Sequence, residues 1–315
     1  MGFFRKILIQ LGWLSDRSKK PPPPPPPPAI LPTLEVFGQP GHGKSSYLWS
    51  VFYMLRKLNL VWPDYLCWPQ DDATEEALKA IHENVHEGRL PPRGAEGNEL
   101  RYDLRLQNME RWGEKKLVVW DWPDPVFSPP DSNGARKETV NWGAPAWWLI
   151  SLPDLRDVQV EYLDMVFDDL VRKRISQGYP VYSRPLRLVV VLTKGDAIPD
   201  LPLPIRDYLK QDPLWKAVSA EGFGDSPLLG AEPLRAYLAT LSNAHAMIQQ
   251  WLNSTLHGHM LLRRAAEYHV QLKFAIVSAT GSGFVESGKL QFPWTPRRVL
   301  DPLFWAMEFD SAPLR

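Results

Sequence analysis

Short apolar runs alternate with longer stretches of helical spacing along most of the chain. Apolar runs that suit buried strands occur at 34–37, 117–120, 147–152, 188–192 and 274–277, and helical patterns occupy 44–58, 158–177 and 233–269. Strands that alternate with helices indicate a parallel sheet covered on both faces. We therefore predict an α/β fold with three layers and a mostly parallel sheet.

One interval departs from this alternation. Residues 99–107 alternate strictly between apolar and polar positions, and a polar turn at 112–115 leads into the apolar run 117–120. Strict alternation is typical of a strand with one buried face, and a short turn joins antiparallel neighbours. The sequence thus predicts one antiparallel hairpin strand within the parallel sheet, with large insertions around it.

The N-terminal residues form a pattern of their own. Residues 1–20 place apolar side chains on one helical face and carry five basic residues against one acidic residue, and 21–28 are all proline. A basic amphipathic helix binds an anionic membrane surface or a groove on a protein partner, and polyproline is a stiff spacer. We predict an amphipathic helix at 1–20, a polyproline spacer at 21–33 and one domain at 34–315. A short helix packed on its own domain is the alternative for 1–20.

Composition removes several function classes. The chain has 315 residues, with 36 Lys+Arg against 36 Asp+Glu, so the zero net charge argues against a nucleic-acid binder. No uncharged apolar run reaches the 18 residues of a membrane-spanning helix. The single cysteine, Cys67, excludes an internal disulfide framework and fits a reducing compartment. We expect a cytoplasmic protein, with peripheral membrane contact through 1–20 as the second possibility.

The most specific motif follows the first predicted strand. Residues 38–45 read GQPGHGKS, which fits the phosphate-binding pattern G-x-x-x-x-G-K-[ST]. Backbone N–H groups wrap a phosphate only where side chains do not intrude, and the N-terminus of the next helix favours an anion. Lys44 would hold the β- and γ-phosphates, and the Ser45 hydroxyl would bind Mg²⁺. The predicted phosphate-binding residues are Gly38, Pro40, Gly41, His42, Gly43, Lys44, Ser45 and Ser46.

A second candidate for the metal ends another apolar strand. Asp121 directly follows the run 117–120, where a carboxylate can hold Mg²⁺ beside the phosphates. Trp122 comes next, at the position where many ATP-hydrolysing proteins of this kind carry a glutamate base. We predict that Lys44 and Asp121 are the catalytic residues and that Ser45 and Asp121 hold the metal.

The strand at 188–192 runs into a motif that suits guanine. Thr193, Lys194 and Asp196 fit the pattern [NT]-K-x-D. Guanine offers two parallel donors, N1–H and the N2 amino group, which one carboxylate accepts together, whereas adenine has an acceptor at N1. The aliphatic stem of Lys194 would cover the base. After the next strand, Ser278, Ala279 and Thr280 would add a backbone N–H for the guanine oxygen.

Taken together, residues 34–280 resemble a Ras-like P-loop GTPase domain of the translation-factor-related class. The resemblance rests on these four motifs in their order and on the hairpin before Asp121. The long insertions rich in tryptophan and proline resemble bacterial double-GTPase proteins of conflict systems. The resemblance implies a P-loop NTPase fold, GTP or GDP with Mg²⁺, and a nucleotide-dependent switch for a protein partner, either a second GTPase or an effector.

Several positions depart from the family pattern. Asp124 stands where the third motif has glycine, Pro125 stands where a glutamine often orients water, and Thr74 is too distant to be the switch threonine. We therefore expect slow GTP hydrolysis that a partner arginine could accelerate by roughly 10³–10⁵. A module that binds without hydrolysing and an ATP-hydrolysing protein remain the alternatives. His42 is either a spacer in the loop or a contact for the γ-phosphate or a partner.

Other clusters have simpler explanations. Residues 82–86 read HENVH, which fits the zinc-protease pattern H-E-x-x-H, with Glu110 as a third ligand, but the segment is polar and favours a surface helix. His257 and His259 are only two ligands, so packing is favoured. Trp120, Trp122 and Trp142 surround the expected second switch and are either buried or part of a partner surface.

Overall fold

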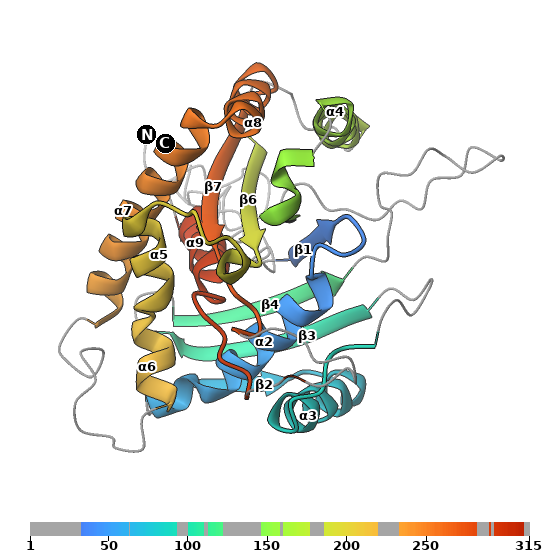
Figure 1. Ribbon diagram of the computed structural model, residues 1–315. Coiled ribbons are helices and arrows are strands. Elements are labelled where there is room, and N and C mark those ends of the chain that lie inside the picture. The colour runs from blue at the N-terminus through green and yellow to red at the C-terminus, as the bar shows by residue number, and fades with distance from the viewer. Residues whose placement is uncertain are drawn as a thin grey trace, which may run out of the picture. The chain divides into compact units, whose positions relative to one another are not determined.

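The described residues form one sheet of seven strands, and five neighbouring strands of it are the predicted parallel core. The computed structural model describes residues 33–62, 64–92, 100–109, 113–121, 146–157, 160–176, 186–219, 233–281, 290 and 293–311. The strands are β1 (Thr33–Gly38), β2 (Leu66–Pro69), β3 (Leu100–Met109), β4 (Gly113–Asp121), β5 (Ala146–Ser151), β6 (Leu186–Thr193) and β7 (Val270–Ile276). Their order across the sheet is β2-β3-β4-β1-β5-β6-β7 (Figure 1).

The hairpin lies where the alternation predicts it. β4, β1, β5, β6 and β7 run parallel to one another, and β3 pairs antiparallel with both β4 and β2. Among the described strands, β3 alone therefore opposes the rest. This confirms the predicted α/β fold with a mostly parallel sheet and one antiparallel hairpin strand.

The turn of this hairpin differs in detail from the prediction. β4 begins at Gly113, inside the stretch predicted as a turn, and the register shifts between Leu106 and Met109. Asn108 lies in that shift with a φ of 57°, a conformation that asparagine tolerates better than most residues. Its side-chain amide donates to the Asp64 carbonyl oxygen at 2.7 Å. The alternation therefore ends in a bulge, which the hydrophobic pattern does not show.

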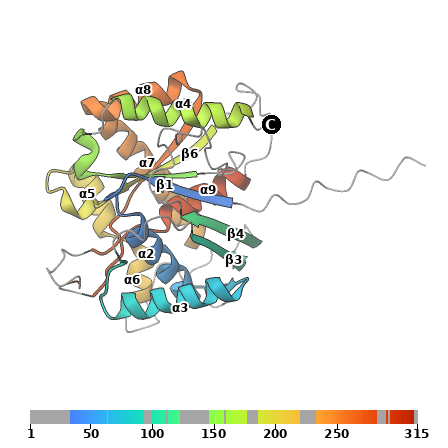
Figure 2. The same cartoon turned by 90° about the vertical axis from the view of Figure 1, so that its right-hand side faces the viewer.

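Helices cover both faces of the sheet. Figure 2 shows α4 and α8 on one side of the sheet and α2 and α3 on the other. The helices are α2 (Lys44–Lys57), α3 (Asp72–His86), α4 (Val160–Ser176), α5 (Leu203–Lys210), α6 (Pro213–Ser219), α7 (Pro233–Ser254), α8 (Leu256–Glu267) and α9 (Asp301–Ser311). Short 3₁₀ helices are η1 (Leu58–Leu60), η3 (Pro153–Asp157) and η4 (Gly195–Ala197).

The helical stretch predicted at 233–269 is confirmed, and the structure divides it into two helices. α7 ends at Ser254, and the Thr255 side chain then caps α8 by accepting from the Gly258 N–H at 3.2 Å. A side chain at Gly258 would place its Cβ 2.3 Å from the Leu252 carbonyl oxygen. The break therefore needs a cap and a glycine that lets two backbones approach.

Two hydrophobic clusters form the core, one on each face. Trp147 belongs to the cluster beneath α2 and α3, and Trp148 belongs to the cluster beneath α4 and α8. Both side chains are fully buried, and the Trp147 indole donates to the Pro302 carbonyl oxygen at 3.1 Å. The pair is thus part of the core strand, as expected, because successive residues of a strand face opposite sides.

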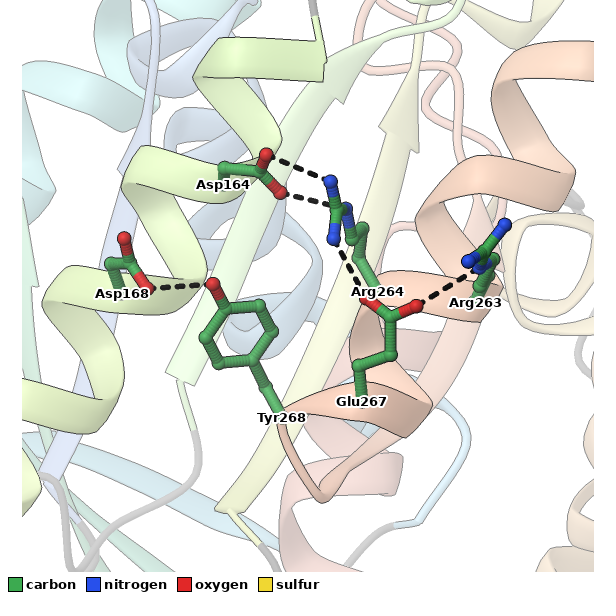
Figure 3. Close-up of polar contacts among 6 residues, drawn as sticks. All are labelled: Asp164, Asp168, Arg263, Arg264, Glu267 and Tyr268. Carbon is green, nitrogen blue, oxygen red and sulfur yellow. Dashed lines mark hydrogen bonds and ion pairs between the residues drawn. The ribbon is translucent and has the colours of Figure 1, made fainter.

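A polar network joins the two helices on the second face. Arg264 of α8 contacts Asp164 of α4 through two of its nitrogens, at 2.8 and 3.0 Å, and also contacts Glu267 at 2.7 Å (Figure 3). Close by, the Tyr268 hydroxyl donates to Asp168 at 2.6 Å. A paired guanidinium and carboxylate are directional, so this network fixes how α8 lies against α4.

Several expectations concern residues outside the described part. The N-terminal helix at 1–20 and the spacer, except for Thr33 at the start of β1, lie outside it. Among the described residues, no helix combines the length and apolarity needed to span a membrane.

A buried histidine makes the stability of the fold depend on pH. His245 of α7 accepts the Phe274 N–H at 3.2 Å, and burial, with Lys273 nearby, lowers the pKa of its side chain to about 4. An unfolded chain takes up this proton near pH 6.5, whereas the folded chain does so only near pH 4. Stability therefore falls as the pH is lowered from about 6.5 to about 4.

We expect urea unfolding to show that the free energy of unfolding falls by about 2 kcal/mol over this range. Solvent at the exposed part of the His245 ring screens the effect and so limits its size. The His245→Gln variant keeps an acceptor for the Phe274 N–H but does not titrate in this range. Its stability should change less between pH 7 and pH 4.5 than that of the parent protein. An equal change in both proteins would assign the pH dependence to other groups.

Candidate nucleotide-binding site

The predicted phosphate loop joins the end of β1 to the start of α2. Gly41 and Gly43 have φ angles of 82° and 81°, in the left-handed region that side chains disfavour. Gly43 is the N-cap of α2, it makes no side-chain cap hydrogen bond, and the first turn carries no acidic residue. The first turn of α2 therefore contributes no carboxylate that would compete for the positive end of the helix dipole, which suits an anion.

Glycine is required at two positions of this loop for different reasons. A Cβ at Gly38 would lie 2.6 Å from the Leu149 carbonyl oxygen of β5, so any side chain there would push the loop away from the sheet. Within the part of the chain that the structure describes, a Cβ at Gly41 would meet nothing within 4 Å. Its φ angle and the open space beside it leave room for a ligand to approach the backbone.

The two side chains predicted to hold phosphate and metal begin α2. The Lys44 ammonium donates to the Gly38 carbonyl oxygen at 3.2 Å, so it bends back over the loop. Ser45 is exposed in the first turn. An ammonium over the loop can donate hydrogen bonds to a phosphate, and a hydroxyl oxygen at the helix start can coordinate its Mg²⁺.

Two side chains fasten the loop from beneath. His42 is 3% exposed, and its Nδ1 lies 3.0 Å from the Leu149 carbonyl oxygen, so Nδ1 carries the hydrogen. The Thr193 hydroxyl donates to the His42 carbonyl oxygen at 2.7 Å. Strands β5 and β6 thus hold the loop in place through one hydrogen bond each.

These contacts refine two expectations from the sequence. The His42 ring is directed at β5, so the packing role is favoured and the side-chain contact with a γ-phosphate is not supported. Burial lowers the pKa of His42, which keeps the ring neutral at neutral pH. The Thr193 hydroxyl braces the phosphate loop, so its place in the guanine motif is that of a support.

A glycine brings the guanine motif close to the last strand. The Gly195 N–H donates to the Val277 carbonyl oxygen at 3.0 Å, and a Cβ at Gly195 would lie 2.6 Å from an Ile276 methyl. Lys194 has a φ of 57°, and its ammonium lies 3.7 Å from a carboxylate oxygen of Asp154 in η3. Asp196 follows with its side chain exposed. The sequence does not predict that Gly195 packs against Ile276 or that Asp154 lies near Lys194. Contacts between distant segments leave no pattern in a single sequence.

The loop after β7 is held by its own set of hydrogen bonds. The Ser278 N–H donates to the Arg297 carbonyl oxygen at 3.1 Å, and the Ser278 hydroxyl accepts from the Gly281 N–H at 3.1 Å. The Ala279 carbonyl oxygen accepts from the Ser50 hydroxyl of α2 at 2.8 Å. The Ser278 N–H is therefore already engaged, so a contact with guanine would come from the next residues.

The candidate motifs meet at one edge of the sheet. The carboxyl ends of parallel strands lie at the same edge, and ligands of α/β proteins bind outside that edge. The phosphate loop follows β1, and Asp121 is the last residue of β4. Thr193 is the last residue of β6, with 194–196 directly after it, and 278–280 follow β7. Asp121 is half-buried and lies opposite Val36, two residues before Gly38. The topology thus brings these four segments to a common edge.

Other predicted features have different outcomes. Thr74 is buried and accepts the Asp103 N–H at 3.1 Å, so it stabilises the edge of the sheet. Trp120 is half-buried, with the Arg101 guanidinium 5.2 Å from its ring. The remaining second-switch positions lie outside the described residues: Trp122, Asp124, Pro125 and Trp142.

The histidine pattern lies on α3, as a surface-helix interpretation requires. The rings of His82 and His86 stack on each other with centroids 6.5 Å apart, and His82 also stacks on Tyr53. Within the described ranges, no group of three or more metal-ligating side chains comes together. Glu110 lies outside them. His259 contacts Asn253 at 3.0 Å. Ring stacking therefore accounts for His82 and His86.

Comparisons with known proteins add little. No protein-family model matches the chain, and a search of curated proteins also finds no match. Among solved structures, Roco2 RocCORdC of Methanosarcina barkeri bound to GDP is similar at a TM-score of 0.27 and 11% identity. The likeness covers 73% of this chain and 60% of that one, so the chain spans less than two thirds of its length. A likeness this low carries no argument about function, and the site geometry has to carry it.

The hydroxyl of Thr193 offers a test of the braced loop. Replacing Thr193 with valine removes the donor to the His42 carbonyl oxygen at nearly constant volume, and should cost about 1 kcal/mol of stability. We expect roughly tenfold weaker nucleotide binding, measured by titration calorimetry, because the loop loses its link to β6. Thr193→Ser keeps a hydroxyl and should bind nearly as the parent does. Equal affinity in all three proteins would show that the hydrogen bond does not position the loop.

Proposed function

We propose that the protein binds GTP and GDP with Mg²⁺, hydrolyses GTP slowly, and acts as a nucleotide-dependent switch for a protein partner. The observation that supports it most is the open left-handed glycine loop before α2, with an uncapped helix start and Lys44 folded over it. Backbone N–H groups of a glycine loop at a helix start, together with a lysine, are suited to binding phosphate.

The choice of guanine rests on the loop after β6. Asp196 is exposed at the same edge of the sheet, and Gly195 keeps its loop hydrogen-bonded to the end of β7. A carboxylate there accepts the two donors of guanine and repels the N1 acceptor of adenine. The stem of Lys194, held near Asp154, would lie against one face of the base. With the Ser278 N–H engaged, the Ala279 N–H is the donor we assign to the guanine oxygen.

Metal binding and chemistry follow from two side chains. Ser45 and Asp121 supply a hydroxyl and a carboxylate oxygen, which are ligands that Mg²⁺ prefers, and the ion would neutralise charge on the phosphates. Lys44 would stabilise the charge that develops on the transferred phosphoryl group. Asp124 and Pro125 depart from the family pattern and favour slow GTP hydrolysis by the protein alone. The partner that we propose is a second GTPase or an effector.

Two other functions would fit parts of the same site. A module that binds nucleotide without hydrolysing it is favoured by Asp124 and Pro125, and an ATP-hydrolysing protein would share the phosphate loop. The nucleotide that the purified protein carries shows whether it binds guanine or adenine nucleotides. We expect chromatography of the denatured protein to release GDP or GTP, whereas bound ADP or ATP would contradict the choice of guanine.

The lysine of the loop tests binding and hydrolysis together. In Lys44→Ala, phosphate release from GTP should fall to background and GDP affinity should drop at least tenfold, since the loop loses its only lysine contact with phosphate. The matched control is Lys57→Ala at the far end of the same helix, which should leave both unchanged. No phosphate release by the parent protein, with binding intact, would favour the module that does not hydrolyse.

The carboxylate of Asp196 tests the base. Asp196→Asn presents an amide donor where guanine also donates, so GTP affinity should fall at least tenfold and xanthosine triphosphate should bind better. Competition against a labelled nucleotide measures both, with the exposed Asp200→Asn as control. Unchanged preference for GTP in Asp196→Asn would remove this residue from the site.

A further inference from the structure

One segment near the C-terminus lies directly against the loop that follows β7. This C-terminal strap, Trp294–Asp301, leads into α9, which begins at Asp301, and the base loop is defined here as Ser278–Gly281. Ser278 and Arg297 form an antiparallel bridge, in which the Arg297 N–H donates to the Ser278 carbonyl oxygen at 2.8 Å. Two residues away, the Thr295 N–H donates to the Thr280 carbonyl oxygen at 2.9 Å. The backbone of the strap thus engages both ends of the motif expected to contact the base.

The same strap also contacts the helix that follows the phosphate loop. The hydroxyl of Tyr47, a fully buried residue of α2, donates to the Val299 carbonyl oxygen at 3.2 Å. Two residues further along α2, Trp49 stacks on Trp294 with ring centroids 6.4 Å apart. Ser50 of α2 in turn donates to the base loop at Ala279. The helix α2 (called the phosphate helix below), the strap and the base loop are therefore each in contact with the other two.

A buried polar cluster anchors the strap on its other side. Arg298 is 3% exposed and adopts a φ of 58°. Its guanidinium donates to the carbonyl oxygens of Tyr208 at 2.9 Å and Gln211 at 2.7 Å, and its backbone N–H donates to the Asp212 carboxylate. A buried arginine with several acceptors is directional and costly to displace, so α5 and α6 fix the middle of the strap.

The end of the strap is fixed in the same way. Asp301 is fully buried and accepts hydrogen bonds from the hydroxyls of Tyr208 and Tyr237. Burial raises the pKa of Asp301 to about 6, so at neutral pH the group is still a carboxylate that can accept both. Three helices, α5, α6 and α7, therefore hold the strap.

We propose that the C-terminal strap is a positioning element that sets the base loop relative to the phosphate helix, and so determines how strongly the protein holds the purine part of a nucleotide. The inference rests on the proposed function. Its physical reason is that a backbone N–H discriminates a base only when its position is fixed to a fraction of an ångström. Ser50 links α2 to the base loop by one direct hydrogen bond, and the strap, which contacts both α2 and the base loop, adds the further contacts that fix them together.

The experiment removes one hydrogen bond of the strap and compares a ligand that has a base with one that has only phosphates. Arg297→Pro lacks the N–H that donates to the Ser278 carbonyl oxygen. Arg297→Ala keeps that N–H and loses only a half-buried side chain that lies over Trp215. Binding of GDP and of inorganic pyrophosphate, each with Mg²⁺, is measured for the parent full-length protein and both variants.

The proposal predicts at least tenfold weaker GDP binding in Arg297→Pro, pyrophosphate affinity within twofold of the parent, and little change of either in Arg297→Ala. Unchanged GDP affinity in Arg297→Pro would overturn it. An equal loss of GDP and pyrophosphate would also overturn it, because the strap would then only support the fold. If the parent itself binds neither compound, the proposed function fails first.

A conservative variant keeps the test decisive if the proline variant does not fold. Tyr47→Phe removes the hydroxyl that donates to the Val299 carbonyl oxygen and leaves the ring in the core. Thermal melting confirms that it is folded. The same selective loss of GDP over pyrophosphate, here about threefold to tenfold, supports the strap as a positioning element, and unchanged GDP affinity overturns it.

Discussion

The carbonyl oxygen of Leu149 is the contact on which the loop between β1 and α2, the proposed phosphate loop, depends. It lies so close to Gly38 that no side chain fits between them, and it accepts the hydrogen of His42 Nδ1. One acceptor in the centre of the sheet therefore fixes the start of the loop by steric contact and its middle by a hydrogen bond. Because β5 is fully buried, this acceptor cannot move without disturbing the core on both faces.

The loop is thus held open before any ligand arrives. Thr193 braces it from β6, and the left-handed glycines turn it toward the start of α2. A phosphate that binds to such a loop does not have to order the backbone first, and avoided ordering appears as affinity. The neutral His42 beneath the loop contributes a donor without adding charge, so the positive charge at this loop comes from Lys44 and the helix dipole.

The base side of the site depends on a different kind of constraint. Gly195 contacts the end of β7, while the strap engages the base loop from the opposite direction and is itself anchored by Arg298 and Asp301. Buried polar groups of this kind add little net stability when they are satisfied, but they favour one arrangement over its alternatives. The protein therefore uses its buried charges to place backbone rather than to strengthen its core.

The sequence by itself determined the parallel sheet, the hairpin and the residues of the phosphate loop. Apolar runs and glycine spacing reflect local rules, since side-chain alternation and backbone freedom are decided within a few residues. Only the tertiary structure decided that Thr193 supports the loop, that the His42 ring faces β5, and that Arg298 anchors the C-terminal strap. Those roles depend on which backbone atoms of distant strands come within hydrogen-bonding distance, and no pattern along one chain encodes a contact between residues more than 80 positions apart.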